Sequence, residues 1–196
     1  NRNPFVSEDA GVCPVAAVRV LNRPFTISEY NFSGPGRFRG IGGLATGALA
    51  ALQDWAGLWR FAWGHKIEVA LHPGTSGIGY FDIASDPLQL ASERASVCLF
   101  LRRDLEPLGR TYAVMLPREK ITDPRSMIGE SLRVDWRWAA WHAKIGTVLG
   151  GAVPPDAAHA GDFTVACGKE GPAVSADLFG SAGEPAVAGD GHVGID

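Results

Sequence analysis

The chain has 196 residues, 46% of them hydrophobic and 20% charged, a length and composition typical of a globular protein of one domain or slightly more. The formal net charge is −3, without a basic stripe or a run of like charge, so we expect no nucleic-acid or membrane partner. The apolar runs are all shorter than the roughly 20 residues that a membrane helix requires. An initiator Met is absent, so we expect the chain to begin inside a longer protein or to have been processed.

A strand, a helix and a second strand are predicted in the first third of the chain. Residues 25–30 are aromatic and β-branched and precede a cluster of turn-forming residues, which is typical of a strand. The apolar spacing predicts a helix over 41–55, and Gly57 separates it from a second strand over 58–63. The predicted buried face of the helix consists of Ile41, Leu44, Ala45, Ala48, Leu52 and Trp55. Because short links join these elements, we expect a βαβ unit with parallel strands.

A Gly-rich excursion over 66–83 leads to a further predicted helix over 87–101. Asp86 is a good N-cap for this helix, Pro87 suits the first helical position, and Gln89 completes a capping-box pattern. The predicted buried face of this helix consists of Leu88, Ala91, Ala95, Cys98 and Leu99.

The remainder of the chain has a different character. Its predicted elements are an apolar strand over 111–116, an amphipathic helix over 136–149 and a weak strand over 163–166. Residues 150–196 are mostly Gly, Ala, Pro and Asp, which bury little apolar surface to offset the entropy cost of ordering. We therefore predict an α/β unit over 1–106, followed by a smaller β-rich, partly loop-like accessory region over 107–196.

Glu29 is the residue that most strongly suggests chemistry. It closes an otherwise apolar strand just before the loop that leads to a helix. In parallel α/β barrels the catalytic groups lie at the C-terminal ends of the strands. A carboxylate there has a low-dielectric wall on one side and an open mouth on the other, so its surroundings can tune its reactivity. The alternative is a structural Glu that accepts hydrogen bonds from nearby backbone N–H groups.

Residues near the ends of the two strands could bind a sugar. Trp63 ends the second strand, so its indole is expected near Glu29, where an aromatic face can stack on a sugar ring. Tyr30 could hydrogen-bond a neighbouring carboxylate, and Asn31 and His65 lie just beyond the two strand ends. The alternatives are core packing for Trp63 and a surface or structural role for His65. Two other aromatic residues of the second strand are expected in the core, Trp59 and Phe61.

Several stretches at matching intervals carry a resemblance to a known clan of enzymes. They are Arg23-Pro24-Phe25-Thr26-Ile27-Ser28-Glu29-Tyr30-Asn31, Ala50-Ala51-Leu52-Gln53-Asp54-Trp55-Ala56-Gly57-Leu58, Phe61-Ala62-Trp63 and Phe81-Asp82-Ile83-Ala84-Ser85-Asp86-Pro87. The first three resemble the seventh and eighth strands of retaining (β/α)8-barrel glycoside hydrolases, the clan that includes β-galactosidases and cellulases. The fourth resembles the start of the eighth helix in bacterial members. The resemblance covers about residues 15–106 and is specific for the clan, not for a substrate.

The resemblance implies an α/β fold that is the C-terminal part of a TIM barrel, with Glu29 as the nucleophile of a retaining double displacement. It also implies that Trp63 lines the sugar subsite. The acid/base Glu of the clan usually follows an Asn, but this sequence contains no Asn-Glu dipeptide. A whole barrel takes about 250 residues, so we expect a fragment that pairs with the missing N-terminal barrel half or self-associates. We predict an oligo- or polysaccharide substrate for the complete enzyme and negligible turnover by this chain alone.

Two other functions are compatible with these residues. One is a non-catalytic carbohydrate-binding or interaction module that retains part of a barrel. The other is a phosphate-binding barrel enzyme that uses the glycine-rich loop 34–40, although its spacing is not G-x-G-x-x-G and no Lys follows as in a P-loop. The His residues show no metal-ligand spacing and the three Cys are far apart, so we expect no metal or other cofactor.

Overall fold

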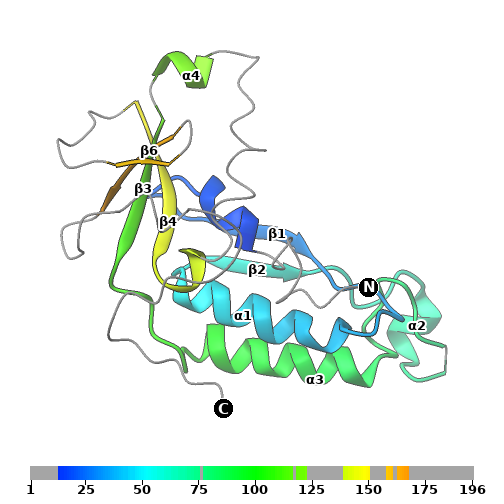
Figure 1. The fold of residues 1–196 in the computed structure, drawn as a ribbon. Helices are drawn as coiled ribbons and strands as arrows, with labels where there is room; N and C mark the ends of the chain where they lie inside the picture. The colour runs from blue at the N-terminus through cyan, green and yellow to red at the C-terminus, as the bar shows by residue number, and fades with distance from the viewer. Residues whose placement is uncertain are drawn as a thin grey trace.

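The computed structural model describes residues 13–75, 77–116, 118–122, 139–150, 158–160 and 163–167, which form helices and two small sheets (Figure 1). Among these residues, no helix has both the length and the apolar character needed to cross a membrane. Predictions for the rest of the chain, including the first part of the predicted helix over 136–149, lie outside the described residues.

The predicted βαβ unit is confirmed. Strand β1 (Thr26–Tyr30), helix α1 (Gly42–Leu52) and strand β2 (Gly57–Arg60) follow one another, and the two strands pair in parallel. The register places Thr26 beside Gly57 and Tyr30 beside Arg60, with an irregularity between them. Strand β2 ends earlier than residue 63, because the chain beyond Arg60 bonds to a different segment: the backbone N–H of Ala62 donates to the Phe81 carbonyl at 3.1 Å.

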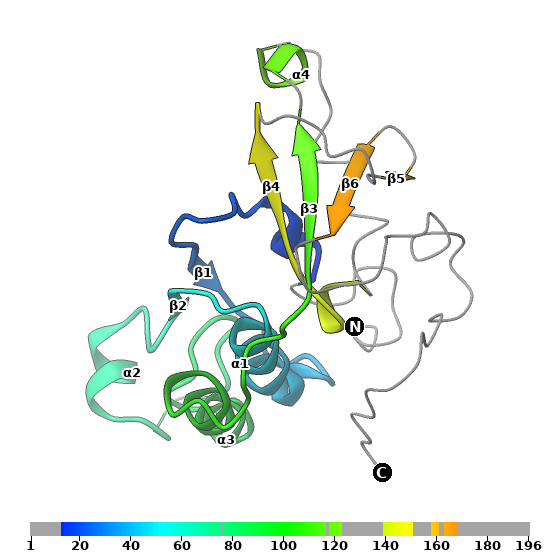
Figure 2. The ribbon, with the colours of Figure 1, turned by 90° about the vertical axis from the view of Figure 1, so that its left-hand side faces the viewer.

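Helix α3 (Pro87–Ser96) begins as predicted and continues into a π-helical turn, η3 (Val97–Leu101). The Asp86 side chain accepts hydrogen bonds from the backbone N–H groups of Leu88 and Gln89, which confirms it as the N-cap. Helices α1 and α3 lie side by side along one face of the β1–β2 pair (Figure 2). The order of these elements is therefore β1-α1-β2-α3, with the short helix α2 (Ile67–Leu71) between β2 and α3. The assignment of this order to the end of a TIM barrel stays a prediction.

The predicted buried faces of these two helices are wrong in part. Leu44 and Leu88 are each 45% exposed, while the buried face of α3 is polar and consists of Gln89, Ser92 and Ser96. The reason lies in two glycines of α1, because a Cβ at Gly43 or Gly47 would lie 2.6 Å or 2.5 Å from the backbone of α3. Backbones this close leave room for Ser side chains but not for Leu.

The second sheet has the order β4-β3-β6-β5. Strands β3 (Thr111–Leu116) and β4 (Lys144–Leu149) are parallel, whereas β6 (Phe163–Cys167) is antiparallel to β3 and to the short β5 (Ala158–Ala160). The predicted strands at 111–116 and 163–166 are confirmed. Shorter helical segments are η1 (Cys13–Val18), η2 (Arg39–Ile41), α2 (Ile67–Leu71), α4 (Arg118–Thr122) and η4 (Ala139–Trp141).

The helix predicted over 136–149 is wrong over 144–149, although the 3-10 helix η4 lies within the predicted range. Lys144–Leu149 is the strand β4, paired along its whole length with β3. The backbone N–H of Leu21 also donates to the Thr147 carbonyl at 2.9 Å, so β4 is bonded on both sides. β-Branched residues such as Ile145 and Thr147 fit a sheet well, and these distant partners override the apolar spacing that suggested a helix.

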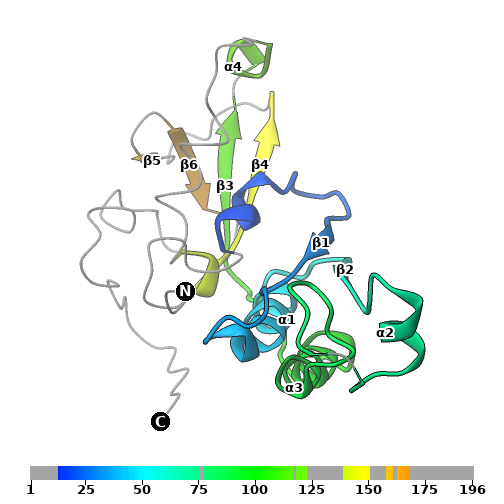
Figure 3. The same cartoon turned by 90° about the vertical axis from the view of Figure 1, so that its right-hand side faces the viewer.

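One hydrophobic core connects the βαβ unit with the second sheet, which stands at one end of the helices in Figure 1 and above them in Figure 3. Its buried members are Ala16, Leu49, Ala50, Trp55, Tyr112, Val114, Leu116, Ala140, Ala143 and Ile145. The described parts on either side of residue 106 thus pack against each other, and the division of the chain into two units at that point stays a prediction.

Candidate functional site

The C-terminal ends of β1 and β2 point away from the second sheet and toward α2 (Figure 1). Backbone hydrogen bonds join three segments at this end. The N–H of Phe61 donates to the Tyr30 carbonyl at 2.9 Å, the N–H of Gly34 to the Tyr80 carbonyl at 2.8 Å, and the N–H of Ile83 to the Ala62 carbonyl at 3.1 Å. The loops after both strands and the segment before α3 therefore form one connected surface.

Glu29 is the second-last residue of β1, and its side chain is exposed. No hydrogen bond or ion pair joins its carboxylate to another described residue. The structural alternative, a Glu that accepts bonds from backbone N–H groups, therefore finds no support among these contacts. Among the described residues, Glu29 is thus an exposed carboxylate without a partner, at the end of a parallel strand.

Trp63 and His65 lie in the loop that follows β2. The Trp63 side chain is 49% exposed, and its indole N–H donates to the Ala70 carbonyl at 3.2 Å, which holds the ring on this surface. The His65 ring packs edge-on against Phe61, with 5.0 Å between ring centres. Trp59 is 55% exposed, so its predicted core role is wrong. It lies on the short strand β2, and no further layer of the described structure covers its side chain.

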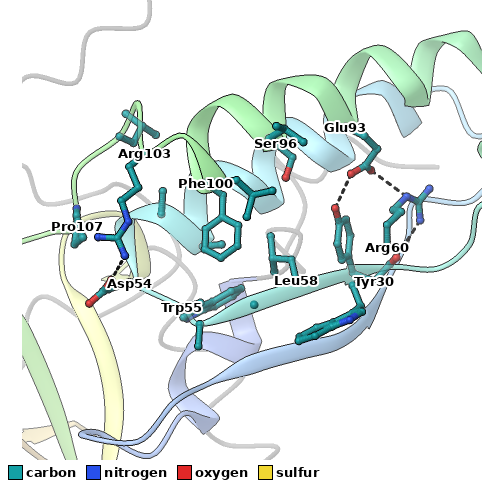
Figure 4. Close-up of a pocket in the computed structure, with 18 residues that line it drawn as sticks. Tyr30, Asp54, Trp55, Leu58, Arg60, Glu93, Ser96, Phe100, Arg103 and Pro107 are labelled. Atoms are coloured by element: carbon teal, nitrogen blue, oxygen red, sulfur yellow. Dashed lines mark hydrogen bonds and ion pairs between the residues drawn. The ribbon is translucent and has the colours of Figure 1, made fainter.

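Tyr30 and Asn31 have different surroundings. Asn31 is partly buried directly after β1. The Tyr30 side chain is buried, and its hydroxyl donates to Glu93 Oε2 at 2.6 Å (Figure 4). Sequence analysis suggested a carboxylate partner for Tyr30, and the structure identifies that partner as Glu93 on α3. The hydroxyl therefore faces the helix layer.

Arg60 completes a polar cluster with Tyr30 and Glu93. Its Nε lies 3.0 Å from Glu93 Oε1, and its guanidinium carbon lies 5.6 Å from the centre of the Tyr30 ring. Burial, together with the bond to Glu93, raises the pKa of the Tyr30 hydroxyl. Burial also raises the pKa of the Glu93 carboxyl, against the opposing effects of Tyr30 and Arg60. The sequence did not indicate Glu93 or Arg60 as members of this cluster, because Glu93 lies 63 residues from Tyr30 along the chain.

A cavity of about 630 Å³ lies between the β1–β2 pair and α3 (Figure 4). The Tyr30–Arg60–Glu93 cluster is at one end, and a loose ion pair between Asp54 and Arg103, 4.0 Å apart, is at the other. The wall between them is largely apolar and includes Ala50, Trp55, Leu58, Val97, Phe100, Leu101, Leu105 and Pro107. Glu29 does not line this cavity. Because the polar end groups bond to one another, the cavity offers apolar packing more than chemistry.

The glycine-rich loop 34–40 uses its backbone N–H groups within the protein. The N–H of Gly34 donates to Tyr80, that of Gly36 to Ser33, and that of Arg39 to Gly36. A Cβ on Gly34 would lie 2.5 Å from the Gly79 carbonyl oxygen, so this glycine permits the close approach of two loops. These bonds weigh against a phosphate cradle, which needs N–H groups free to face a ligand.

Among the described residues, no group of three or more His, Cys, Asp or Glu side chains could hold a metal ion. Comparison of the chain with protein-family models, with curated proteins and with solved structures found no match.

Proposed function

We propose that this chain is part of a retaining glycoside hydrolase, with Glu29 as the nucleophile and the acid/base residue supplied from outside the described residues. The observation that supports the proposal is the exposed Glu29 carboxylate, which bonds to no other described residue and lies at the C-terminal end of a strand in a parallel βαβ unit. Barrel enzymes carry their catalytic groups at this position. The exposed Trp63 indole in the next loop adds a surface on which a sugar ring could stack.

In the proposed mechanism, Glu29 attacks the anomeric carbon and forms a glycosyl-enzyme, which water then hydrolyses. The second carboxyl of a retaining enzyme lies about 5–5.5 Å from the first. Two other carboxylates among the described residues are already engaged, because Asp82 bonds to His65 and Glu93 bonds to Tyr30 and Arg60. Because neither carboxylate is free to act as the acid, we assign that role to a residue outside the described part of the chain.

The test is a trapping experiment that does not need the acid residue. The purified chain is incubated with dinitrophenyl fluoroglycosides, in which fluorine replaces the hydroxyl beside the anomeric carbon. The dinitrophenolate leaves without protonation and the fluorine slows hydrolysis, so the glycosyl-enzyme accumulates. We expect intact-mass spectrometry to show one added sugar, peptide mapping to place it on Glu29, and unactivated glycosides to remain uncleaved.

Glu29→Gln is expected to abolish the label, whereas Glu106→Gln, which changes another exposed carboxylate, is the matched control and should leave it unchanged. A label on a different residue, or none with any of the gluco-, galacto- and xylo-configured reagents, would contradict the proposal. Turnover of ordinary aryl glycosides by the chain, lost in Glu29→Gln, would support Glu29 as the nucleophile. It would contradict the expectation that the chain by itself lacks an acid/base residue.

A non-catalytic carbohydrate-binding module is the second candidate. The exposed side chains of Trp63 and Tyr80 favour it, because aromatic residues at a surface can hold sugars without any catalytic group. Sugar binding that survives Glu29→Gln unchanged, together with no covalent label, would support this candidate over the hydrolase.

A further inference from the structure

We propose that Asp82 is a positioning residue that orients the His65 imidazole to accept a hydrogen bond from a hydroxyl of a bound pyranoside. The inference rests on the carbohydrate substrate class of the proposed function and deepens it. It assigns Asp82, which resembles an ordinary turn residue in the sequence, to the support of a binding side chain.

Asp82 holds His65 at two points through one oxygen. The backbone N–H of His65 donates to Asp82 Oδ1 at 3.0 Å, and the ring nitrogen Nδ1 bonds to the same oxygen. The Asp82 side chain is mostly buried, while the His65 side chain is about half exposed. A mostly buried carboxylate thus anchors an imidazole that still reaches the surface.

Aromatic packing restrains the ring further. The His65 ring centre lies 5.0 Å from that of Phe61, at an interplanar angle of 80°, and 6.1 Å from that of Phe81. The rings of Phe61 and Phe81 also contact each other, with 5.7 Å between their centres. Within the described part of the chain, no residue bonds to the second ring nitrogen, Nε2. The ring is therefore held at Nδ1 and at its sides, and Nε2 is open to a ligand.

When the His65 ring is neutral, its tautomer defines what Nε2 can bind. A carboxylate at Nδ1 favours the tautomer with its proton on Nδ1, which makes Nε2 a hydrogen-bond acceptor. A sugar hydroxyl is a suitable donor, and its ring also presents C–H groups to aromatic surfaces. Trp63 lies two residues before His65, and the Tyr80 ring centre lies 4.6 Å from that of Phe81. Both supply such surfaces, since they are 49% and 64% exposed.

His65 also lies at the same end of the parallel pair as Glu29. Phe61, which packs on the His65 ring, donates its backbone N–H to the carbonyl of Tyr30, the residue after Glu29. One backbone hydrogen bond therefore joins the strand that carries Glu29 to the loop that carries His65.

The experiment titrates the isotope-labelled chain with methyl β-glucopyranoside and, separately, methyl β-galactopyranoside, and follows the His65 ring signals by NMR. We expect ring nitrogen shifts of the Nδ1–H tautomer in the free chain and a change at Nε2 on binding. Asp82→Ala should weaken binding about fivefold, the loss expected for one poorly oriented hydrogen bond. Asp82→Asn retains an oxygen for both donors and should restore part of that affinity.

A double variant separates positioning from simple structural support. His65→Gln alone should weaken binding as Asp82→Ala does, and Asp82→Ala added to His65→Gln should weaken it no further, because the two act as one unit. His72→Gln, at another exposed His, is the matched control and should bind as the unchanged chain does. Amide spectra of each variant report whether the fold is retained.

Unchanged sugar affinity or an unchanged His65 tautomer in a folded Asp82→Ala chain would overturn the inference. So would additive losses in the double variant. Labelling of Glu29 with no effect of Asp82→Ala would reject the inference and leave the hydrolase standing. Sugar binding that depends on Asp82 without any label on Glu29 would reject the hydrolase and support the inference.

Discussion

Asp86 is a fully buried carboxylate whose two oxygens bind groups from three neighbours. Oδ1 accepts from the backbone N–H groups of Leu88 at 3.1 Å and Gln89 at 3.3 Å. Oδ2 accepts from the Gln89 side chain at 3.1 Å and pairs with Arg39. Burial by itself raises the pKa of Asp86, but the hydrogen bonds from Arg39 and Gln89 outweigh it and lower that pKa below its ordinary value of 3.8.

The lowered pKa of Asp86 gives stability a defined pH dependence. The charged carboxylate stabilises the folded chain above its ordinary pKa, and this stabilisation is lost as pH falls through the lower folded pKa. Asp86→Asn keeps a capping oxygen but leaves Arg39 without its counter-charge, so we expect the free energy of unfolding at neutral pH to fall by about 3 kcal/mol. Urea denaturation should show that the difference in unfolding free energy between Asp86→Asn and the unchanged chain becomes smaller below about pH 4.

The matched control is Asp104→Asn, which removes a carboxylate from an exposed pair with Arg102. It should change stability little at any pH, because exposed ion pairs are screened by water. A difference between Asp86→Asn and the unchanged chain that stays constant from neutral to acid pH would contradict the role given to its charge.

At the scale of elements, small residues set the distance between α1 and α3. A Cβ at Gly47 would lie 2.5 Å from the Ser96 Cα, and one at Gly43 would lie 2.6 Å from the Ser92 carbonyl oxygen. The Ser92 hydroxyl accepts a hydrogen bond from the backbone N–H of Leu44 at 3.1 Å. The two helices are thus joined by backbone proximity and polar contacts, and Leu44 of α1 and Leu88 of α3 are left 45% exposed.

Gly47→Ala tests whether close packing against α3 outweighs the higher helix propensity of alanine. Alanine favours a helix by about 1 kcal/mol over glycine, but here its methyl group would overlap the backbone of α3. We expect a net loss of about 1–3 kcal/mol in the free energy of unfolding, measured by chemical denaturation. Gly109→Ala, where a Cβ meets nothing within 4 Å, is the control and should be neutral or slightly stabilising. Stabilisation by Gly47→Ala would contradict the close packing.

At the scale of the whole molecule, Gln53 connects the end of α1 with the second sheet. Its side chain is fully buried. Its Nε2 donates to the carbonyls of Ala140 and Ala143, each at 2.6 Å, and its Oε1 accepts from the N–H of Ile145 at 2.8 Å. The Arg19 side chain donates to the Gln53 backbone carbonyl, so the first described segment meets at the same point.

Gln53→Leu tests how strongly this junction holds the two sheets together. It would leave two carbonyls and one N–H group buried without partners, at about 1–3 kcal/mol each. We expect the free energy of unfolding to fall by about 3–5 kcal/mol in urea denaturation. Asp54→Asn changes the adjacent residue, whose ion pair with Arg103 is half exposed, and should cost less than about 0.5 kcal/mol. Equal effects of the two substitutions would contradict the junction.

Local signals in the sequence were sufficient for the start of α3 and for the parallel pairing of β1 and β2. The N-cap at Asp86 depends on residues within three positions, and a strand, a short helix and a strand permit few other arrangements. The same signals placed Glu29 at the end of its strand. Its proposed role as a nucleophile comes from resemblance and stays a prediction.

Contacts between distant residues decided what local signals could not. Lys144–Leu149 is a strand because β3 and the chain around Leu21 bond to it, although its apolar spacing also suits a helix. The partners of Tyr30 and Gln53 lie 63 or more residues away, so no nearby pattern could predict them. Hydrogen bonds form between groups that the fold brings together, whereas periodicity and capping act within a single turn or strand.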